Sequence, residues 1–181
     1  MNRQFWVGIL IVLVAIMLFN QKVNLVRLLI KQLDVFKDAR TGKRSIWDII
    51  CFFVFPIVIA TIIVFGIPYR ITSRLAEILT TVFSLVFTIL FGFAAVIVEK
   101  RDSDNAMKRK IISETFVSII TSTSHSLFAA FVSILLTSLT TDLYVSILSV
   151  VLFAVSFHIV MLLLMITKRT FVIYCEGERD N

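Results

Sequence analysis

Residues 111–139 read IISETFVSIITSTSHSLFAAFVSILLTSL, an unbroken stretch of 29 residues without Lys, Arg, Gly or Pro. A helix needs about 20 consecutive, mainly apolar residues to cross a membrane, so this stretch predicts one spanning helix. Its middle is polar, because residues 121–126 (TSTSHS) contain five hydroxyl side chains and a histidine. The rest of the sequence is therefore analysed for what these polar side chains face in the membrane.

Three further apolar blocks accompany this stretch, at residues 46–66, 75–98 and 143–166. Only helices and closed barrels satisfy all backbone hydrogen bonds in lipid, and none of the blocks shows the two-residue alternation of barrel strands. Of the 181 residues, 59% are hydrophobic and 17% are charged, below the roughly 25% charged residues of a typical soluble domain. We therefore expect an all-α integral membrane protein with a four-helix transmembrane domain over residues 46–166.

Residues 1–45 are expected to form a hydrophobic anchor followed by an amphipathic helix. The block 5–19 has 15 apolar residues and no small-residue cleavage site after it, so we expect it to stay attached, although its length leaves open whether it crosses the membrane. Residues 22–37 have a basic face and an apolar face, which is typical of a helix lying on an anionic inner leaflet. Docking of a partner protein is the alternative. The predicted apolar face consists of Val26, Leu29, Ile30, Leu33 and Phe36.

The Lys and Arg residues are unevenly distributed between the two ends of the predicted bundle. Sixteen of the eighteen lie in residues 1–45, 99–110 and 167–181, which a four-span arrangement places on one side. The positive-inside rule assigns that side to the cytoplasm, with 167–181 as a short cytoplasmic tail. This asymmetry accounts for the net charge of +6 without direct nucleic-acid binding.

The basic side chains of the predicted cytoplasmic side form a candidate docking surface for a soluble partner protein. The cytoplasmic segments themselves are too short to bury a core of their own. The residues of this predicted surface are Arg27, Lys31, Arg40, Lys43, Arg44, Lys108, Arg109, Lys110, Lys168 and Arg169.

Two of the predicted spans carry a polar stripe, which begins with a glutamate and runs along one helical face. Such a stripe is either a surface for close helix packing or the lining of a wet pathway, in one protomer or on an oligomer axis. Intramembrane acids are costly and usually functional, so Glu114 is the best single candidate, unless it only stabilises the helix N-terminus. The two stripes comprise Glu77, Thr81, Ser84 and Thr88, continued by Gly92, and Glu114, Ser118, Thr121, Ser122 and His125.

The two histidines, His125 and His158, are expected at similar depth, because they lie 16 residues before and 17 residues after the turn near residue 141. Paired helices are about 8–10 Å apart, too close for a haem, and the sequence offers no third metal ligand nearby. We therefore predict no cofactor and no metal, and we expect His125 to hydrogen-bond to a neighbouring helix. Phosphate-binding loops, HExxH and a nucleophile with a base are all missing from the sequence, which predicts a protein that is not an enzyme.

Three segments carry a resemblance to a known family: residues 43–60 (KRSIWDIICFFVFPIVIA), 113–127 (SETFVSIITSTSHSL) and 157–169 (FHIVMLLLMITKR). In this order they resemble the small four-span membrane proteins of bacterial phage-defence systems, most nearly the KwaA membrane subunits of the Kiwa system. The resemblance covers residues 43–169 and carries over no catalytic residue. It implies a multi-pass protein of the bacterial inner membrane, a homo-oligomer with a tetramer favoured, and a cytoplasmic partner similar to KwaB, which is linked to DNA binding.

Two functional hypotheses follow from these expectations. The first is a non-enzymatic platform or sensor subunit of an antiphage defence complex, embedded in membrane lipid and holding a cytoplasmic partner protein. The second is a pore-forming effector of a defence system, in which the polar stripes conduct ions.

Overall fold

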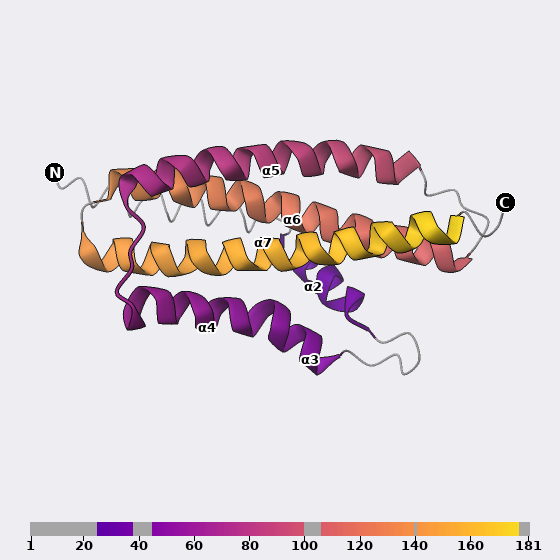
Figure 1. The fold of residues 1–181 in the computed structure, drawn as a ribbon, viewed down its shortest axis with the longest axis horizontal. Helices are drawn as coiled ribbons and strands as arrows, with labels where there is room; N and C mark the ends of the chain where they lie inside the picture. Colours follow the sequence, from indigo (N-terminus) through magenta and orange to yellow (C-terminus); the bar gives the residue numbers. More distant parts are fainter. Residues whose placement is uncertain (1–24, 38–44, 100–105, 140, 178–181) are drawn as a thin grey trace.

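The computed structural model describes residues 25–37, 45–99, 106–139 and 141–177, and within these ranges it contains helices and short links but no β-strand (Figure 1). The predicted anchor at residues 5–19 lies outside the described residues. The helical elements are α2 (Leu25–Val35), α3 (Ile46–Ile49), η1 (Ile50–Val54), α4 (Phe55–Thr61), η2 (Ile62–Gly66), α5 (Ser73–Glu99), α6 (Ala106–Ser138) and α7 (Asp142–Gly177).

In the described part of the chain, four helical segments are long and apolar enough to cross a membrane, which confirms the predicted four-span helical domain. They are Ile46–Gly66, Ser73–Glu99, Lys108–Ser138 and Asp142–Val172. The helix α7 continues past the predicted end of its span at residue 166, so residues 167–177 are its last turns and not a separate tail.

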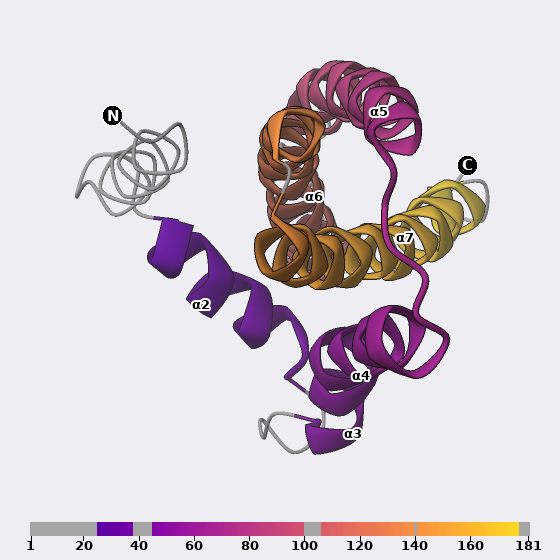
Figure 2. The same cartoon turned by 90° about the vertical axis from the view of Figure 1, so that its left-hand side faces the viewer.

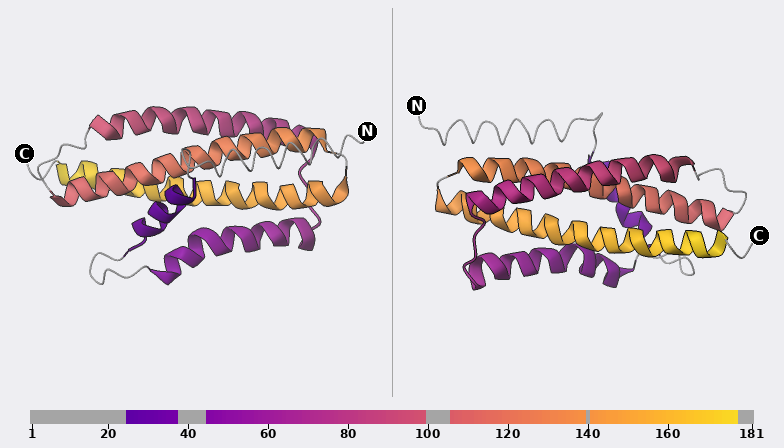
Figure 3. Two further views of the ribbon diagram at one scale, coloured as in Figure 1. Left: turned by 180° about the vertical axis from the view of Figure 1, so that it is seen from behind. Right: turned by 45° about the horizontal axis from the view of Figure 1, so that its top comes forward.

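The helix α6 lies at the centre of the bundle, between α5 and α7, and α2 also packs against it (Figure 2). Within its span 56% of the residues are buried, against 17% to 28% for the other three spans. The first span packs against the outer side of α7, as views from two further directions also show (Figure 3). The polar centre of the quoted sequence is therefore in the one span that is mostly surrounded by protein.

The first span is irregular around Pro56. Proline has no backbone N–H, so Pro56 cannot donate to the carbonyl of Phe52 four residues earlier. The segment before it, Ile50–Val54, is π-helical, and the span ends with a second π-helical segment at Gly66. From α7, Nδ1 of His158 lies 2.7 Å from the Phe52 carbonyl oxygen. Because a carbonyl can only accept, His158 donates this bond and supplies a partner that the proline removes.

Each end of the bundle is fixed by contacts between distant segments. At one end Arg70 and Asp142 form an ion pair of 3.1 Å, and the Ile71 amide donates to the Ser149 hydroxyl at 3.2 Å. These two contacts hold the antiparallel spans in register at that end. The opposite end is called the basic end below and is formed by residues 45–48, 106–110 and 168–172.

The helix α2 packs on the bundle with a face that matches the predicted one only in part. Gln32, Val35 and Phe36 are buried, whereas Ile30, which the sequence placed on the apolar face, is 49% exposed. The ring of Phe36 lies 4.8 Å from that of Phe52, measured between centroids. This aromatic contact turns the C-terminal part of α2 towards the protein, so its described residues pack on the bundle and not only on lipid.

Candidate functional site

The polar stripe of α6 points into the protein. Ser118, Thr121 and Ser122 are fully buried, and His125 is partly buried. The hydroxyl of Ser118 donates to the Glu114 carbonyl at 3.0 Å, and that of Thr121 donates to the Val117 carbonyl at 2.8 Å. Hydroxyl groups that bond their own helix leave little polarity for a neighbour, so the stripe acts mainly as a narrow surface for close packing.

The hydroxyl of Ser122 is different, because its oxygen is buried and has no hydrogen-bond partner among the described residues. Buried polar groups normally have a partner, and one without a partner carries the cost of its lost hydration. Ser122 therefore contributes to the fold through its small size and not through its hydroxyl.

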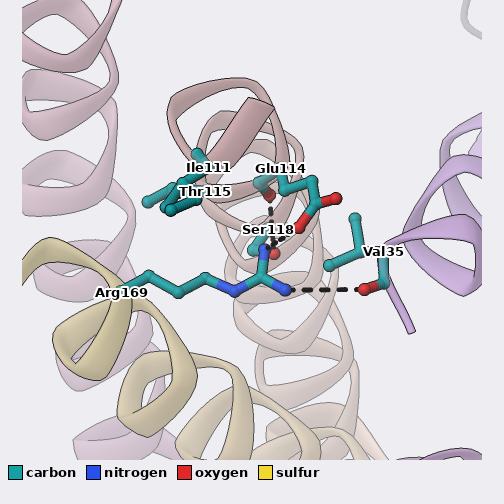
Figure 4. Close-up of polar contacts among 6 residues, drawn as sticks. All are labelled: Val35, Ile111, Glu114, Thr115, Ser118 and Arg169. Carbon is teal, nitrogen blue, oxygen red and sulfur yellow. Dashed lines mark hydrogen bonds and ion pairs between the residues drawn. The ribbon is translucent and has the colours of Figure 1, made fainter. Parts of the chain in front are cut away.

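The glutamate that begins this stripe forms a contact between three helices (Figure 4). The Glu114 carboxylate lies 3.2 Å from Nη1 of Arg169 on α7, and the two side chains are 25% and 20% exposed. Nη2 of Arg169 also donates to the Val35 carbonyl at the end of α2, at 3.5 Å. Glu114 and Arg169 thus join α2, α6 and α7 at the basic end. Although Arg169 belongs to the predicted docking surface, it is directed towards its own protein.

The two histidines meet at similar depth, as the sequence predicts, with ring centroids 5.0 Å apart. Nδ1 of His125 lies 2.7 Å from the Thr121 carbonyl oxygen of its own helix. The expectation that His125 bonds a neighbouring helix is therefore wrong. That role belongs to His158, because the missing N–H of Pro56 leaves the Phe52 carbonyl in need of a donor.

A mostly apolar groove of about 370 Å³ opens beside the histidine pair, between the first span and α7. Nε2 of His158 is buried and has no hydrogen-bond partner within the described part of the chain. The described residues contain no group of three or more His, Cys, Asp or Glu side chains that could hold a metal ion.

The polar stripe of α5 points away from the protein. Glu77, Thr81, Ser84 and Thr88 are all exposed. A Cβ added to Gly92, further along the same stripe, would meet no atom within 4 Å. The packing face of α5 is formed instead by its buried side chains, which are Ala76, Phe83, Leu90, Ala94 and Ile97.

The predicted docking residues are distributed over separate parts of the structure. Arg109, Lys110 and Lys168 are exposed at the basic end, and Lys108 is partly buried there. Arg27 and Lys31 are exposed on α2. Arg40, Lys43 and Arg44 lie outside the described residues.

An open groove of about 760 Å³ lies at the basic end, between the end of α2, the start of the first span, α6 and α7. We call it the end groove. No sequence pattern predicts this groove, because its walls come from four segments that are far apart in the chain. It is lined by Val35, Phe36, Lys37, Ser45, Asp48, Phe52, Ile111, Glu114, Met161, Leu164, Met165, Lys168, Arg169 and Val172.

The comparisons with known proteins identify no family or related structure for this chain. No protein-family model, no curated protein and no solved structure matches the chain. Its function therefore has to be inferred from the arrangement of its own residues.

Proposed function

We propose that this protein is a non-enzymatic membrane platform or sensor subunit that assembles with copies of itself and holds a soluble partner protein at its basic end. The resemblance to phage-defence membrane subunits supports a role in an antiphage complex of the bacterial inner membrane. The observation that carries the proposal is the outward direction of the α5 stripe.

Self-assembly explains why hydroxyl groups and a glycine occupy the outer face of a spanning helix. Small residues let two membrane helices approach closely. The hydroxyls of Thr81 and Thr88 donate to carbonyls of their own helix, so the stripe favours contact through close approach and not through interhelical hydrogen bonds. Thr81, Ser84, Thr88 and Gly92 would give no such benefit against lipid alone. A second copy packed on this face would bury the stripe.

Partner binding is supported by the exposed charges at the basic end. Arg109 and Lys110 are both exposed on the first turns of α6. Charge on such a surface attracts an acidic protein, and salt weakens the attraction beyond about 8–10 Å. The partner would be a soluble protein, KwaB-like if the resemblance extends to the whole system.

A pore is the second candidate, and the same stripe favours it. If several copies place α5 around a common axis, the hydroxyls of Thr81, Ser84 and Thr88 would line that axis instead of a contact. The buried stripe of α6 offers no comparable lining, because Ser118, Thr121 and Ser122 are enclosed within the protomer.

Self-assembly is tested by the mass of the protein purified in mild detergent. The variant Gly92→Leu adds bulk where the protomer has open space, so it should leave the protomer folded and reduce the assembled fraction at least tenfold. The matched control is Val82→Leu, on an exposed part of α5 away from the stripe. Equal assembly of both variants and the unchanged protein would exclude the α5 face as the contact.

Two measurements distinguish the platform hypothesis from the pore hypothesis: ion conductance in liposomes and capture of the proposed soluble partner protein. A platform predicts no conductance, and it predicts that the double variant Arg109→Glu, Lys110→Glu loses the captured protein. Because charge reversal can also invert a membrane protein, cysteine labelling at residues 103 and 141 has to show unchanged orientation. Conductance that changes with Thr88→Ala while assembly stays intact would favour the pore.

A further inference from the structure

The end groove changes from apolar to charged along α7. Met161 and Met165 line its deeper part, and Lys168 lines the part nearest the basic end. Seven residues of α-helix span about 10 Å, so this change occurs over the depth from the outer acyl chain to the headgroup of a phospholipid. The groove lies at the end of the spanning segments, where the headgroups of one leaflet are expected.

The charges in this groove are only partly neutralised by the protein. Glu114 is paired with Arg169 at 3.2 Å, and Lys37 is paired with Asp34 at 3.1 Å. Asp48 and Lys168 also line the groove, but within the described residues neither of them forms an ion pair. Among the described residues, the groove therefore has one negative and one positive side chain without an ion-pair partner, and these two do not pair with each other.

We propose that the end groove binds phosphatidylethanolamine, a phospholipid whose headgroup carries both an ammonium and a phosphate. Asp48 accepts hydrogen bonds from the ammonium, Lys168 donates to the phosphate, and an acyl chain lies against Met161 and Met165. A complementary pair of charges distinguishes this headgroup from two alternatives. An anionic phosphatidylglycerol offers Asp48 no cation, and the three methyl groups of phosphatidylcholine remove the N–H donors and keep its cation away from the carboxylate.

This site would also influence the internal contact beside it. Glu114, Arg169 and the end of α2 share the same groove, so a bound lipid would pack against the point at which α2 joins the bundle. The proposal requires only that the basic end lies at a membrane surface. It does not depend on self-assembly or on a soluble partner, so failure of either leaves it standing.

The experiment measures lipid binding to the purified, delipidated full-length protein by native mass spectrometry. The probes are phosphatidylethanolamine, phosphatidylglycerol and phosphatidylcholine with identical acyl chains. Exposed ion pairs contribute about 0.2–1 kcal/mol, so phosphatidylethanolamine should bind about 1.4- to fivefold more tightly than either of the others. Equal binding of the three lipids, or tightest binding of phosphatidylglycerol, would overturn the proposal.

Two variants assign the headgroup contacts. Asp48→Asn should reduce phosphatidylethanolamine binding to the level of phosphatidylcholine and increase phosphatidylglycerol binding. Lys168→Gln should weaken the binding of all three lipids, because each of them carries a phosphate, and it changes an exposed side chain, so the phosphate contact can be tested even if Asp48→Asn unfolds. The control is Arg74→Gln, an exposed base outside the groove and at the opposite end of the bundle, which should change none of the three. An unchanged lipid preference in Asp48→Asn, or unchanged lipid binding in Lys168→Gln, would contradict the assignment.

Discussion

The stripes on α5 and α6 have similar sequences but opposite surroundings. Each begins with a glutamate and continues with Ser and Thr, yet Ser84 on α5 is exposed and Ser122 on α6 is fully buried. Periodicity shows which residues share a helical face, but it does not show which face meets the rest of the protein. A polar stripe in a membrane helix can therefore serve close packing inside one protomer or contact with something outside it.

The position of each helix in the bundle decides between these uses. The helix α6 has neighbours on several sides, and narrow side chains such as Ser118 and Ser122 let those neighbours approach. The helix α5 lies at the edge and directs its large side chains Phe83 and Leu90 inwards. Its outer face carries the polar stripe together with large apolar side chains such as Leu85, which is 60% exposed.

The largest expected effect comes from adding bulk to the buried stripe. Ser122→Leu forces a branched side chain into a fully packed site, and overpacking of this kind costs about 3 kcal/mol at the upper end of its usual range. Ser84→Leu on α5 should change the unfolding free energy of the protomer by less than about 0.5 kcal/mol, as exposed substitutions do. The measurement is unfolding of the detergent-purified protein by added denaturing detergent.

Similar losses of unfolding free energy in Ser122→Leu and Ser84→Leu would contradict the distinction between the two stripes, since both would then be packed within one protomer. Assembly should be measured on the same samples, so that dissociation is not mistaken for unfolding.

The second expected effect concerns the acid that begins each stripe. Arg169→Met leaves the half-enclosed Glu114 without its partner, which should cost about 2 kcal/mol, less than the 3–5 kcal/mol of a fully buried pair. The double variant Glu114→Gln, Arg169→Met should regain most of that loss, because no unpaired charge remains. Glu77→Gln on α5 should change the stability of the protomer little, since Glu77 is exposed.

A double variant that is less stable than Arg169→Met alone would contradict this account of the ion pair. Lys168→Met is the matched control on α7, because Lys168 is the adjacent exposed base.

The chain sequence predicts the spans and their number because both depend on local composition. Apolar length is a property of consecutive residues, and 46–66 is recovered to the residue. The turn near residue 141 also follows from the sequence, and with it the similar depth of His125 and His158. Depth is predictable because helical rise is constant.

The contacts of the site are less predictable because they join residues that are distant in the chain. Phe52 and His158 are separated by 106 residues, and Val35 and Arg169 by 134. One signal was present in the sequence: Pro56 indicates that the Phe52 carbonyl lacks its usual donor. The sequence gives no indication that His158 supplies the replacement.

The third prediction tests whether His158 stabilises the fold through its hydrogen bond to the Phe52 carbonyl. His158→Phe keeps a ring of similar size but removes the donor to the Phe52 carbonyl, which should cost about 1–2 kcal/mol. In a Pro56→Ala background, the new Ala N–H can satisfy the same carbonyl, so His158→Phe should cost about 1 kcal/mol less. Unfolding of the four proteins of this double-mutant cycle measures the coupling. Equal costs of His158→Phe in both backgrounds would mean that the ring packs and the hydrogen bond contributes little.

The smallest expected effect separates hydroxyl from size at the centre of α6. Ser122→Ala removes an oxygen that is buried without a hydrogen-bond partner, so it removes a cost of burial and leaves the narrow helix surface unchanged. The unfolding free energy should stay within about 0.5 kcal/mol of the unchanged protein or increase slightly. Ser126→Ala is the matched variant one turn later, because the Ser126 hydroxyl, unlike that of Ser122, has a partner and donates to the Ser122 carbonyl at 2.9 Å. Interhelical hydrogen bonds in membranes average about 0.6 kcal/mol, so a loss above 1 kcal/mol in Ser122→Ala would reveal a partner outside the protomer. In that case the buried stripe would take part in assembly, and the distinction between α5 and α6 would no longer hold.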